Sequence, residues 1–89
     1  MISKTLTIIN KLGLHARASS KLVSLANQYQ SKVTIEKDGQ VANAKSLMTV
    51  MMLSASLGSN VTLVADGSDE VAALEALTTL IQNKFGEES

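Results

Sequence analysis

Apolar residues recur at every second position in some stretches of this chain and at helical spacing in others, and the order of these stretches constrains the fold most. Period-two alternation marks residues 2–9, 32–37 and 61–65. Residues 16–28 and the C-terminal region from Ser68 carry apolar side chains at helical spacing instead. Because a strand repeats every second residue and a helix after about 3.6 residues, the two patterns predict different elements.

A tight turn separates two of the expected strands. In the segment KVTIEK, residues 32–37, apolar and polar side chains alternate, and Asp38-Gly39 follows directly. An Asp-Gly pair beside an alternating stretch is a strong signal for a two-residue hairpin turn, because both residues tolerate positive φ. Val41 continues on the other side of the turn, so we expect two antiparallel strands here.

Three helices are expected between and after the strands. The first covers residues 16–28, and its apolar stripe consists of Ala18, Leu22, Leu25, Ala26 and Tyr29. Ser46 precedes the short run LMTVMML and is a good N-cap for a brief helix. Ser68 is expected to cap the last helix, with Asp69 and Glu70 in the first turn, where acids suit the positive end of the helix dipole. The apolar face of that helix is expected to consist of Val71, Leu74, Leu77, Leu80, Ile81 and Phe85, with Gly86 as its stop.

The resulting order is β-α-β-β-α-β-α, which predicts an α+β fold: one four-stranded antiparallel sheet with its helices on one face. The chain has 89 residues, of which 45% are hydrophobic. That is enough for a single domain, residues 1–89, with one modest core. A large enclosed active-site cavity is not expected in a domain of this size.

Composition argues against several classes of function. With no cysteine and one histidine, we expect no bound metal and no cofactor. One Tyr and one Phe with dispersed basic residues give no platform for nucleic acid. The N-terminal MISKTLTII lacks the pattern of a signal peptide, and no stretch approaches the ~20 apolar residues of a membrane span. We therefore expect a cytoplasmic protein without membrane insertion.

The formal net charge of zero hides an uneven distribution along the chain. Residues 1–45 hold seven Lys or Arg and two acids, a net charge of +5, whereas residues 46–89 hold one Lys and six acids, a net charge of −5. The only histidine, His15, lies in the basic half, which favours the approach of an anionic group. A folded chain can interleave its halves, so an ordinary mixed surface explains the same numbers equally well.

His15 lies in the motif GLHAR, at the N-terminus of the helix predicted for residues 16–28. The first N–H groups of a helix lack intrahelical acceptors and attract anions. Imidazole is a nucleophile that can accept a phosphoryl group on nitrogen, and the added phosphate would lie beside the N–H groups of Ala16 and Arg17. Candidate counter-charges are Arg17, Lys21 and Lys45. From spacing alone a plainer interpretation stays open, in which His15 only caps the helix and Arg17 is solvated.

The motif GLHARASSKLV, followed further along by NAKSLMTVMML, resembles the HPr family of histidine phosphocarriers in the bacterial phosphoenolpyruvate-dependent phosphotransferase system, which includes the nitrogen-branch paralogue NPr. The resemblance covers almost the whole chain and implies the HPr open-faced β-sandwich, four antiparallel strands under three helices. It implies that His15 takes a phosphoryl group from phosphorylated Enzyme I and gives it to an Enzyme IIA, in sugar uptake or nitrogen-type regulation. Arg17 matches the arginine that assists the transfer. Such a chain is a phosphoryl carrier and not an enzyme, and we expect a monomer.

The second motif suggests regulation and docking. By resemblance, Ser46 matches the serine that an HPr kinase/phosphorylase modifies in some bacteria, although a simple helix cap explains a serine there as well. The family's exposed apolar docking patch is matched by Leu47, Met48 and Met51. Methionine suits a surface that meets several partners because its side chain is flexible. The alternative is that Met48, Met51 and Met52 fill the core. Leu47, Met48 and Met51 share one helix face, however, which makes Val50 and Leu53 the better core candidates.

The chain departs from the family pattern at two positions. Ala18 replaces the usual proline of HARP, which restores an N–H donor near the expected anion and removes some rigidity. The N–H groups of Ala16, Arg17 and Ala18 are therefore the expected phosphate-binding backbone. Thr49 stands where glycine is common, and its β-branched side chain is less permissive of a close backbone approach.

Two other functions compete with the carrier. One is a docking-only regulatory module, in which the same helix face binds a partner without phosphorylation. The other is a hydrolase, which is disfavoured because no acid or base is paired with His15 in the local sequence.

Overall fold

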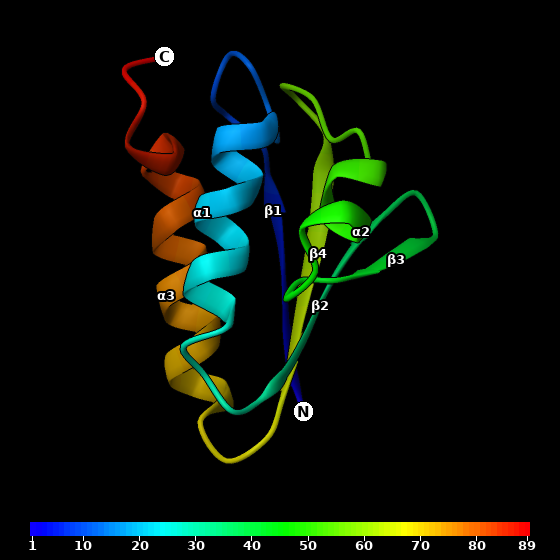
Figure 1. Ribbon diagram of the computed structural model, residues 1–89, viewed down its shortest axis with the longest axis vertical. Helices are drawn as coiled ribbons and strands as arrows, with labels where there is room; N and C mark the ends of the chain where they lie inside the picture. The colour runs from blue at the N-terminus through cyan, green and yellow to red at the C-terminus, as the bar shows by residue number, and fades with distance from the viewer.

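The computed structural model describes residues 1–89 as one four-stranded sheet with three α-helices packed on one face (Figure 1). The elements run in the order expected from the sequence. They are β1 (Ile2–Thr7), α1 (Ala16–Ala26), β2 (Lys32–Lys37), β3 (Gln40–Asn43), α2 (Leu47–Met52), β4 (Asn60–Asp66), α3 (Glu70–Gln82) and a 3-10 turn, η1 (Lys84–Gly86). The predicted α+β class and helix arrangement are thus confirmed. None of the helices is long and apolar enough to cross a membrane.

The sheet has the strand order β1-β4-β2-β3, and every neighbouring pair is antiparallel. Its helix-side face supplies the buried core residues Leu6, Val33, Ile35, Ala42, Val61, Leu63 and Ala65. The opposite face carries polar side chains, such as Thr5 and Thr62, whose Oγ1 atoms lie 3.0 Å apart across the strands. One face of the sheet therefore builds the core and the other has no helix over it (Figure 1).

The predicted hairpin is present. Lys37 pairs with Gln40, and the two residues between them, Asp38 and Gly39, have φ of 51° and 83°. Positive φ at both central positions is the geometry of a type I′ turn, which matches the right-handed twist of the flanking strands.

The helix faces largely follow the predicted spacing, and Val71 departs from it. Buried residues of α1 include Ala18, Leu22 and Ala26, while Leu25 and Tyr29 are only partly buried. In α3 the buried residues are Ala73, Leu74, Leu77, Thr78 and Ile81. Val71 was expected on this face but is 57% exposed. It lies in the first turn of α3, where it borders an open groove beside Ile2 of the edge strand β1, so no element covers it.

The start of α3 differs from the prediction. The residue in the N-cap position is Asp69, not Ser68. The Asp69 carboxylate accepts hydrogen bonds from the Gln30 N–H (2.9 Å), the Ser31 N–H (2.9 Å) and the Ser31 hydroxyl. These bonds join the start of α3 to the α1–β2 loop, and a loop contact of this kind leaves no local pattern in the sequence.

The end of α3 and the start of α2 also differ in detail from the prediction. Phe85 is fully buried but belongs to η1, after α3 has ended at Gln82, and its φ is 56°. Ser46 occupies the N-cap position of α2, but its side chain makes no capping hydrogen bond. The Thr49 hydroxyl donates instead to the carbonyls of Asn43 (2.8 Å) and Ser46 (3.0 Å). A hydroxyl one turn into the helix therefore ties α2 to β3.

Candidate functional site

The loop before His15 is held in one conformation by close backbone contact. Gly13 has φ of 64°, and the Leu14 N–H donates to the Ala55 carbonyl (2.8 Å). A Cβ atom added at Gly13 would lie 2.5 Å from the Ala55 carbonyl oxygen and 2.8 Å from Ser56 Cα. Only glycine combines this φ with so close an approach. The loop thus fixes where His15 enters α1.

His15 is the N-cap residue of α1, with extended backbone (φ −73°, ψ 178°), and its side chain makes no capping hydrogen bond. The first helical bond runs from the Ser19 N–H to the His15 carbonyl (2.8 Å). The N–H groups of Ala16, Arg17 and Ala18 therefore have no intrahelical acceptor, as the sequence predicted. The imidazole is not used as a cap and stays available for chemistry.

The His15 side chain instead contacts the C-terminal tail. Its Nε2 atom meets Glu87 Oε2, and the two side chains are 28% and 18% exposed. The other Glu87 oxygen, Oε1, accepts a hydrogen bond from Asn10 Nδ2 (3.0 Å), which also donates to the Gly13 carbonyl (2.8 Å). No protein group hydrogen-bonds His15 Nδ1. One ring nitrogen is therefore engaged by the tail and the other is unpartnered.

The Asn10 amide, followed by the His15 ring, lowers the pKa of Glu87 below its ordinary value, and the positive charge of Lys21 adds to this effect. Glu87 is therefore ionised at neutral pH, and both of its oxygens act as acceptors.

The tail reaches His15 because η1 is anchored in the core. Phe85 is fully buried, and Lys21 Nζ donates to the Phe85 carbonyl at 2.6 Å. Gly86 follows with φ of 80° and turns the chain toward the start of α1. Glu87 thus follows directly on a segment that the buried Phe85 ring and the Lys21 hydrogen bond hold in place.

His15 lines an open cavity of about 730 Å³. It is lined by Lys11, Leu12, His15, Ala16, Arg17, Glu87, Glu88 and Ser89. Arg17 is exposed and forms no ion pair. The cavity is thus bordered by basic side chains and the start of α1 together with the acids of the tail, and its basic part suits an anionic group.

Two of the expected counter-charges are directed elsewhere. Lys45 Nζ donates to the Tyr29 carbonyl (2.7 Å), beyond the C-terminal end of α1, so Lys45 does not serve His15. Lys21 holds the Phe85 carbonyl and acts on the tail. Lys11, which the sequence analysis did not single out, lines the cavity instead.

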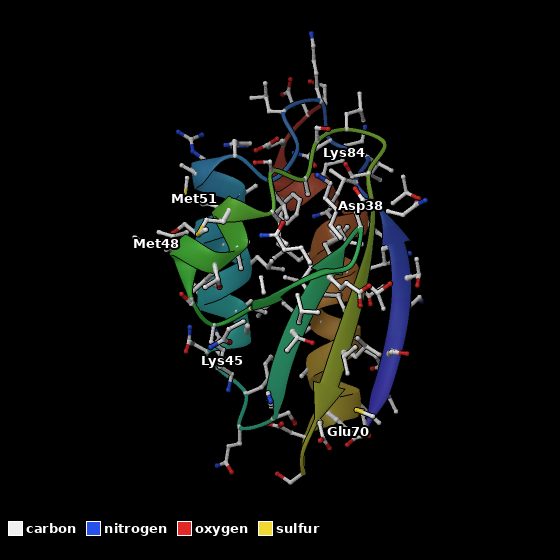
Figure 2. All side chains as sticks on the ribbon, turned by 90° about the vertical axis from the view of Figure 1, so that its right-hand side faces the viewer. Asp38, Lys45, Met48, Met51, Glu70 and Lys84 are labelled. Carbon is white, nitrogen blue, oxygen red and sulfur yellow. The ribbon has the colours of Figure 1, made fainter.

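The expected docking patch is an exposed apolar surface on α2. Leu47, Met48 and Met51 are 42%, 73% and 41% exposed. Met52, which was not part of the expected patch, is 63% exposed and lines a groove of about 470 Å³ together with them. Figure 2 shows Met48 and Met51 pointing outward from this helix. Val50 and Leu53 are buried, as the helical spacing predicted. The methionines therefore do not fill the core, and α2 packs beside α1, the helix that His15 begins (Figure 1).

Asn10 and Glu87 were missed by sequence reasoning. His15 and Glu87 are 72 positions apart, so no local motif could pair them. The only signal was that polar residues alone follow Gly86, the expected end of the last helix. The local sequence pairs no acid or base with His15, which disfavours a hydrolase, whereas the fold brings the Glu87 carboxylate to the ring.

Comparison with known proteins relates the chain to one family. The family model described as "PTS HPr component phosphorylation site" matches residues 2–83. Among curated proteins, the phosphocarrier protein HPr of Cupriavidus necator is 55% identical over 87 residues, 98% of each chain. The phosphocarrier protein NPr of Shewanella violacea is 41% identical over 88 residues, 99% of this chain and 97% of its own.

Solved structures show the same relationship in three dimensions. The crystal structure of HPr-C-His from Thermoanaerobacter tengcongensis superposes with a TM-score of 0.97, at 46% identity, over all of both chains. A crystal structure of an HPr dimer from the same organism gives a TM-score of 0.79, at 46% identity, over 98% of this chain and 100% of that one.

Proposed function

Because this chain belongs to the HPr family of the phosphotransferase system and is a phosphocarrier protein, not an enzyme, we propose that His15 is the residue that carries the phosphoryl group. The observation that supports this most is the position of the imidazole, which lies at the start of α1 and lines an open cavity, while Nδ1 has no protein hydrogen-bond partner. Nδ1 is therefore the nitrogen proposed to form the bond to phosphorus.

The surroundings of His15 suit a bound phosphoryl group. The N–H groups of Ala16, Arg17 and Ala18 have no intrahelical acceptor and can donate to its oxygens. The Arg17 guanidinium, free of any ion pair, is the proposed counter-charge, since its fork of donors matches phosphate oxygens. Lys11 adds a second positive charge at the rim.

We propose that phosphorylated Enzyme I is the donor and an Enzyme IIA the acceptor, and that the exchange takes place in the cytoplasm. Leu47, Met48 and Met51 form the proposed docking surface for both partners. What supports this role is their exposure on a helix that packs beside α1. The transfer is proposed to serve sugar uptake or nitrogen-type regulation, since the relatives include both HPr and NPr proteins.

The donor and the acceptor are proposed to bind the same docking surface in turn, and a dimer that covered this surface would block both. We therefore propose that the chain acts as a monomer. A related HPr has been crystallised as a dimer. Sedimentation velocity at cellular concentrations decides the matter, and a dimer that persists on dilution would overturn the proposal.

Regulation at Ser46 is a further part of the proposal. Its hydroxyl is not used for capping, and a phosphate there would add negative charge at the start of α2, beside the docking surface. Incubation with an HPr kinase/phosphorylase and ATP, followed by mass spectrometry, tests this. A Ser46→Ala variant is the control.

Ala18 is proposed to hold the phosphoryl group through its N–H, which a proline would lack. An Ala18→Pro variant should therefore shift the phosphoryl equilibrium with Enzyme I away from phosphorylated His15. Phosphorus NMR of the equilibrated mixture measures the shift, and an unchanged equilibrium would contradict this role.

The main experiment mixes the protein with Enzyme I and phosphoenolpyruvate and follows it by mass spectrometry and phosphorus NMR. We expect an acid-labile phosphate that is absent from a His15→Ala variant and passes to an Enzyme IIA. If His15 stays unmodified while the protein still binds its partners, the docking-only module is the better description. The comparisons do not favour that alternative.

A further inference from the structure

We propose that Glu87 is a positioning residue for phosphoryl transfer, which holds the hydrogen of the His15 ring on Nε2 and so presents the Nδ1 lone pair to the incoming phosphorus. The inference rests on the proposed function of His15. Its structural basis is the contact between His15 Nε2 and Glu87 Oε2, supplied by a tail that Phe85 and Lys21 anchor.

The tautomer follows from what each atom can donate. Asn10 Nδ2 donates to Glu87 Oε1, and the lowered pKa of Glu87 leaves the carboxylate without a hydrogen of its own. The hydrogen between Oε2 and Nε2 must therefore come from the imidazole. A neutral ring with its hydrogen on Nε2 has a lone pair on Nδ1, the nitrogen without a protein partner. The opposite tautomer would leave Nδ1 unreactive and turn the Nε2 lone pair toward a carboxylate.

The same contact helps the reaction in both directions. When Nδ1 forms its bond to phosphorus, the bond from phosphorus to the donor breaks, and its electron pair leaves with the donor. The His15 ring then carries a positive charge, with the hydrogen still on Nε2, and the Glu87 carboxylate beside it stabilises that charge. On transfer to the next acceptor, the ring departs as a neutral imidazole that keeps this hydrogen. No proton has to leave or enter the site.

Asn10 has a supporting role in the same arrangement. Its side chain is fully buried, and Nδ2 donates both to the Gly13 carbonyl and to Glu87 Oε1. Asn10 therefore joins the loop that places His15 to the tail that orients its ring. An outer partner of this kind fixes the geometry of the inner one.

The experiment compares Glu87→Ala with Glu88→Ala. Both variants remove one negative charge from the same cavity, but only Glu87 hydrogen-bonds the ring. Rapid-quench kinetics with Enzyme I and radiolabelled phosphoenolpyruvate should show phosphorylation of Glu87→Ala about tenfold slower than wild type, as is usual when an orienting partner is lost. Glu88→Ala, which removes a cavity charge without touching the ring, should keep the wild-type tautomer and lose less of its rate than Glu87→Ala. Glu87→Gln keeps a neutral acceptor and should fall between them.

Nitrogen NMR of the His15 ring supplies a readout that needs no partner protein. We expect the hydrogen on Nε2 in the wild type and a mixture of both tautomers in Glu87→Ala, with thermal unfolding of the variants compared as a check of folding. Equal rates and equal tautomer populations in Glu87→Ala and Glu88→Ala would overturn the inference, and a faster Glu87→Ala would show the tail to be a barrier. If wild type itself takes no phosphate, the proposed function fails, whereas the ring spectrum still tests the contact.

Discussion

Replacing Gly13 with alanine tests how the backbone contact before His15 stabilises the fold. Gly39→Ala is the matched control. Both glycines have positive φ, 64° and 83°, but a Cβ at Gly13 would lie 2.5 Å from the Ala55 carbonyl oxygen, whereas a Cβ at Gly39 has nothing within 4 Å. The two variants share the conformational cost and differ in the steric one.

The magnitudes follow from these contacts. Alanine in the left-handed region costs about 1 kcal/mol, which is the whole expected effect at Gly39. At Gly13, moving the loop away from Ala55 adds about 1–3 kcal/mol of overpacking. Loss of the hydrogen bond from Leu14 to Ala55, 2.8 Å long, adds about 1 kcal/mol. Gly13→Ala should therefore lower the free energy of unfolding by about 3–5 kcal/mol, and Gly39→Ala by about 1 kcal/mol.

Urea denaturation at constant pH measures both free energies of unfolding. A difference of about 3 kcal/mol between the variants corresponds to a Tm difference of about 15 °C in a domain of this size. If the two alanine variants lose the same stability, the steric argument is wrong and the left-handed φ alone explains the glycine at position 13.

Three further predictions concern the tail, the α3 anchor and the docking surface. Phe85→Ala removes a fully buried ring and should lower the free energy of unfolding by about 3 kcal/mol in urea denaturation. The variant should also be phosphorylated as slowly as Glu87→Ala. A wild-type rate would show that the tail reaches His15 without this anchor. The Ser31 hydroxyl, followed by the Gln30 N–H, lowers the pKa of Asp69, so the contribution of Asp69 to stability is complete above about pH 4 and is lost as the pH falls through the lowered pKa. Urea midpoints measured against pH should show Asp69→Asn less stable than wild type at neutral pH. A stability difference between the two proteins that does not shrink in acid would contradict this. Met48→Gln should weaken partner binding in calorimetry while changing the free energy of unfolding by less than about 0.5 kcal/mol. Val50→Ala, at a buried position, should lower the free energy of unfolding by about 2 kcal/mol. If Met48→Gln destabilises the fold and leaves binding unchanged, Met48 does not belong to the docking surface.

The elements that the sequence predicted well are those whose signal is local. Alternation in residues 32–37 and the pair Asp38-Gly39 determine a strand, a turn and the facing strand within a few positions, and the observed register follows directly. The same holds for His15 at the start of α1, because the GLHAR motif and the helical stripe adjoin. Short-range patterns are set by backbone geometry, which neighbouring residues share.

The elements that the sequence predicted poorly depend on contacts between distant segments. Asp69 occupies the N-cap position of α3, but its carboxylate binds Gln30 and Ser31 and does not cap the helix. Val71 is exposed because α3 begins beside an edge strand. The pairing of His15 with Glu87 depends on where Phe85 packs. None of these contacts has a periodicity or a spacing that a single sequence reveals.

The strand order also determines when the sheet and the contacts of His15 can form during synthesis of the chain. β1 pairs only with β4, so β1, which is synthesised first, cannot join the sheet until residues 60–66 have been synthesised. The contact of the His15 ring forms later still, because the Glu87 carboxylate lies 72 positions further along the chain. A chain that ended after Phe85 would hold the histidine and the helix start without the carboxylate that contacts the ring. The role proposed for Glu87 therefore predicts that a chain shortened after Phe85 accepts phosphate more slowly than one that keeps Glu87.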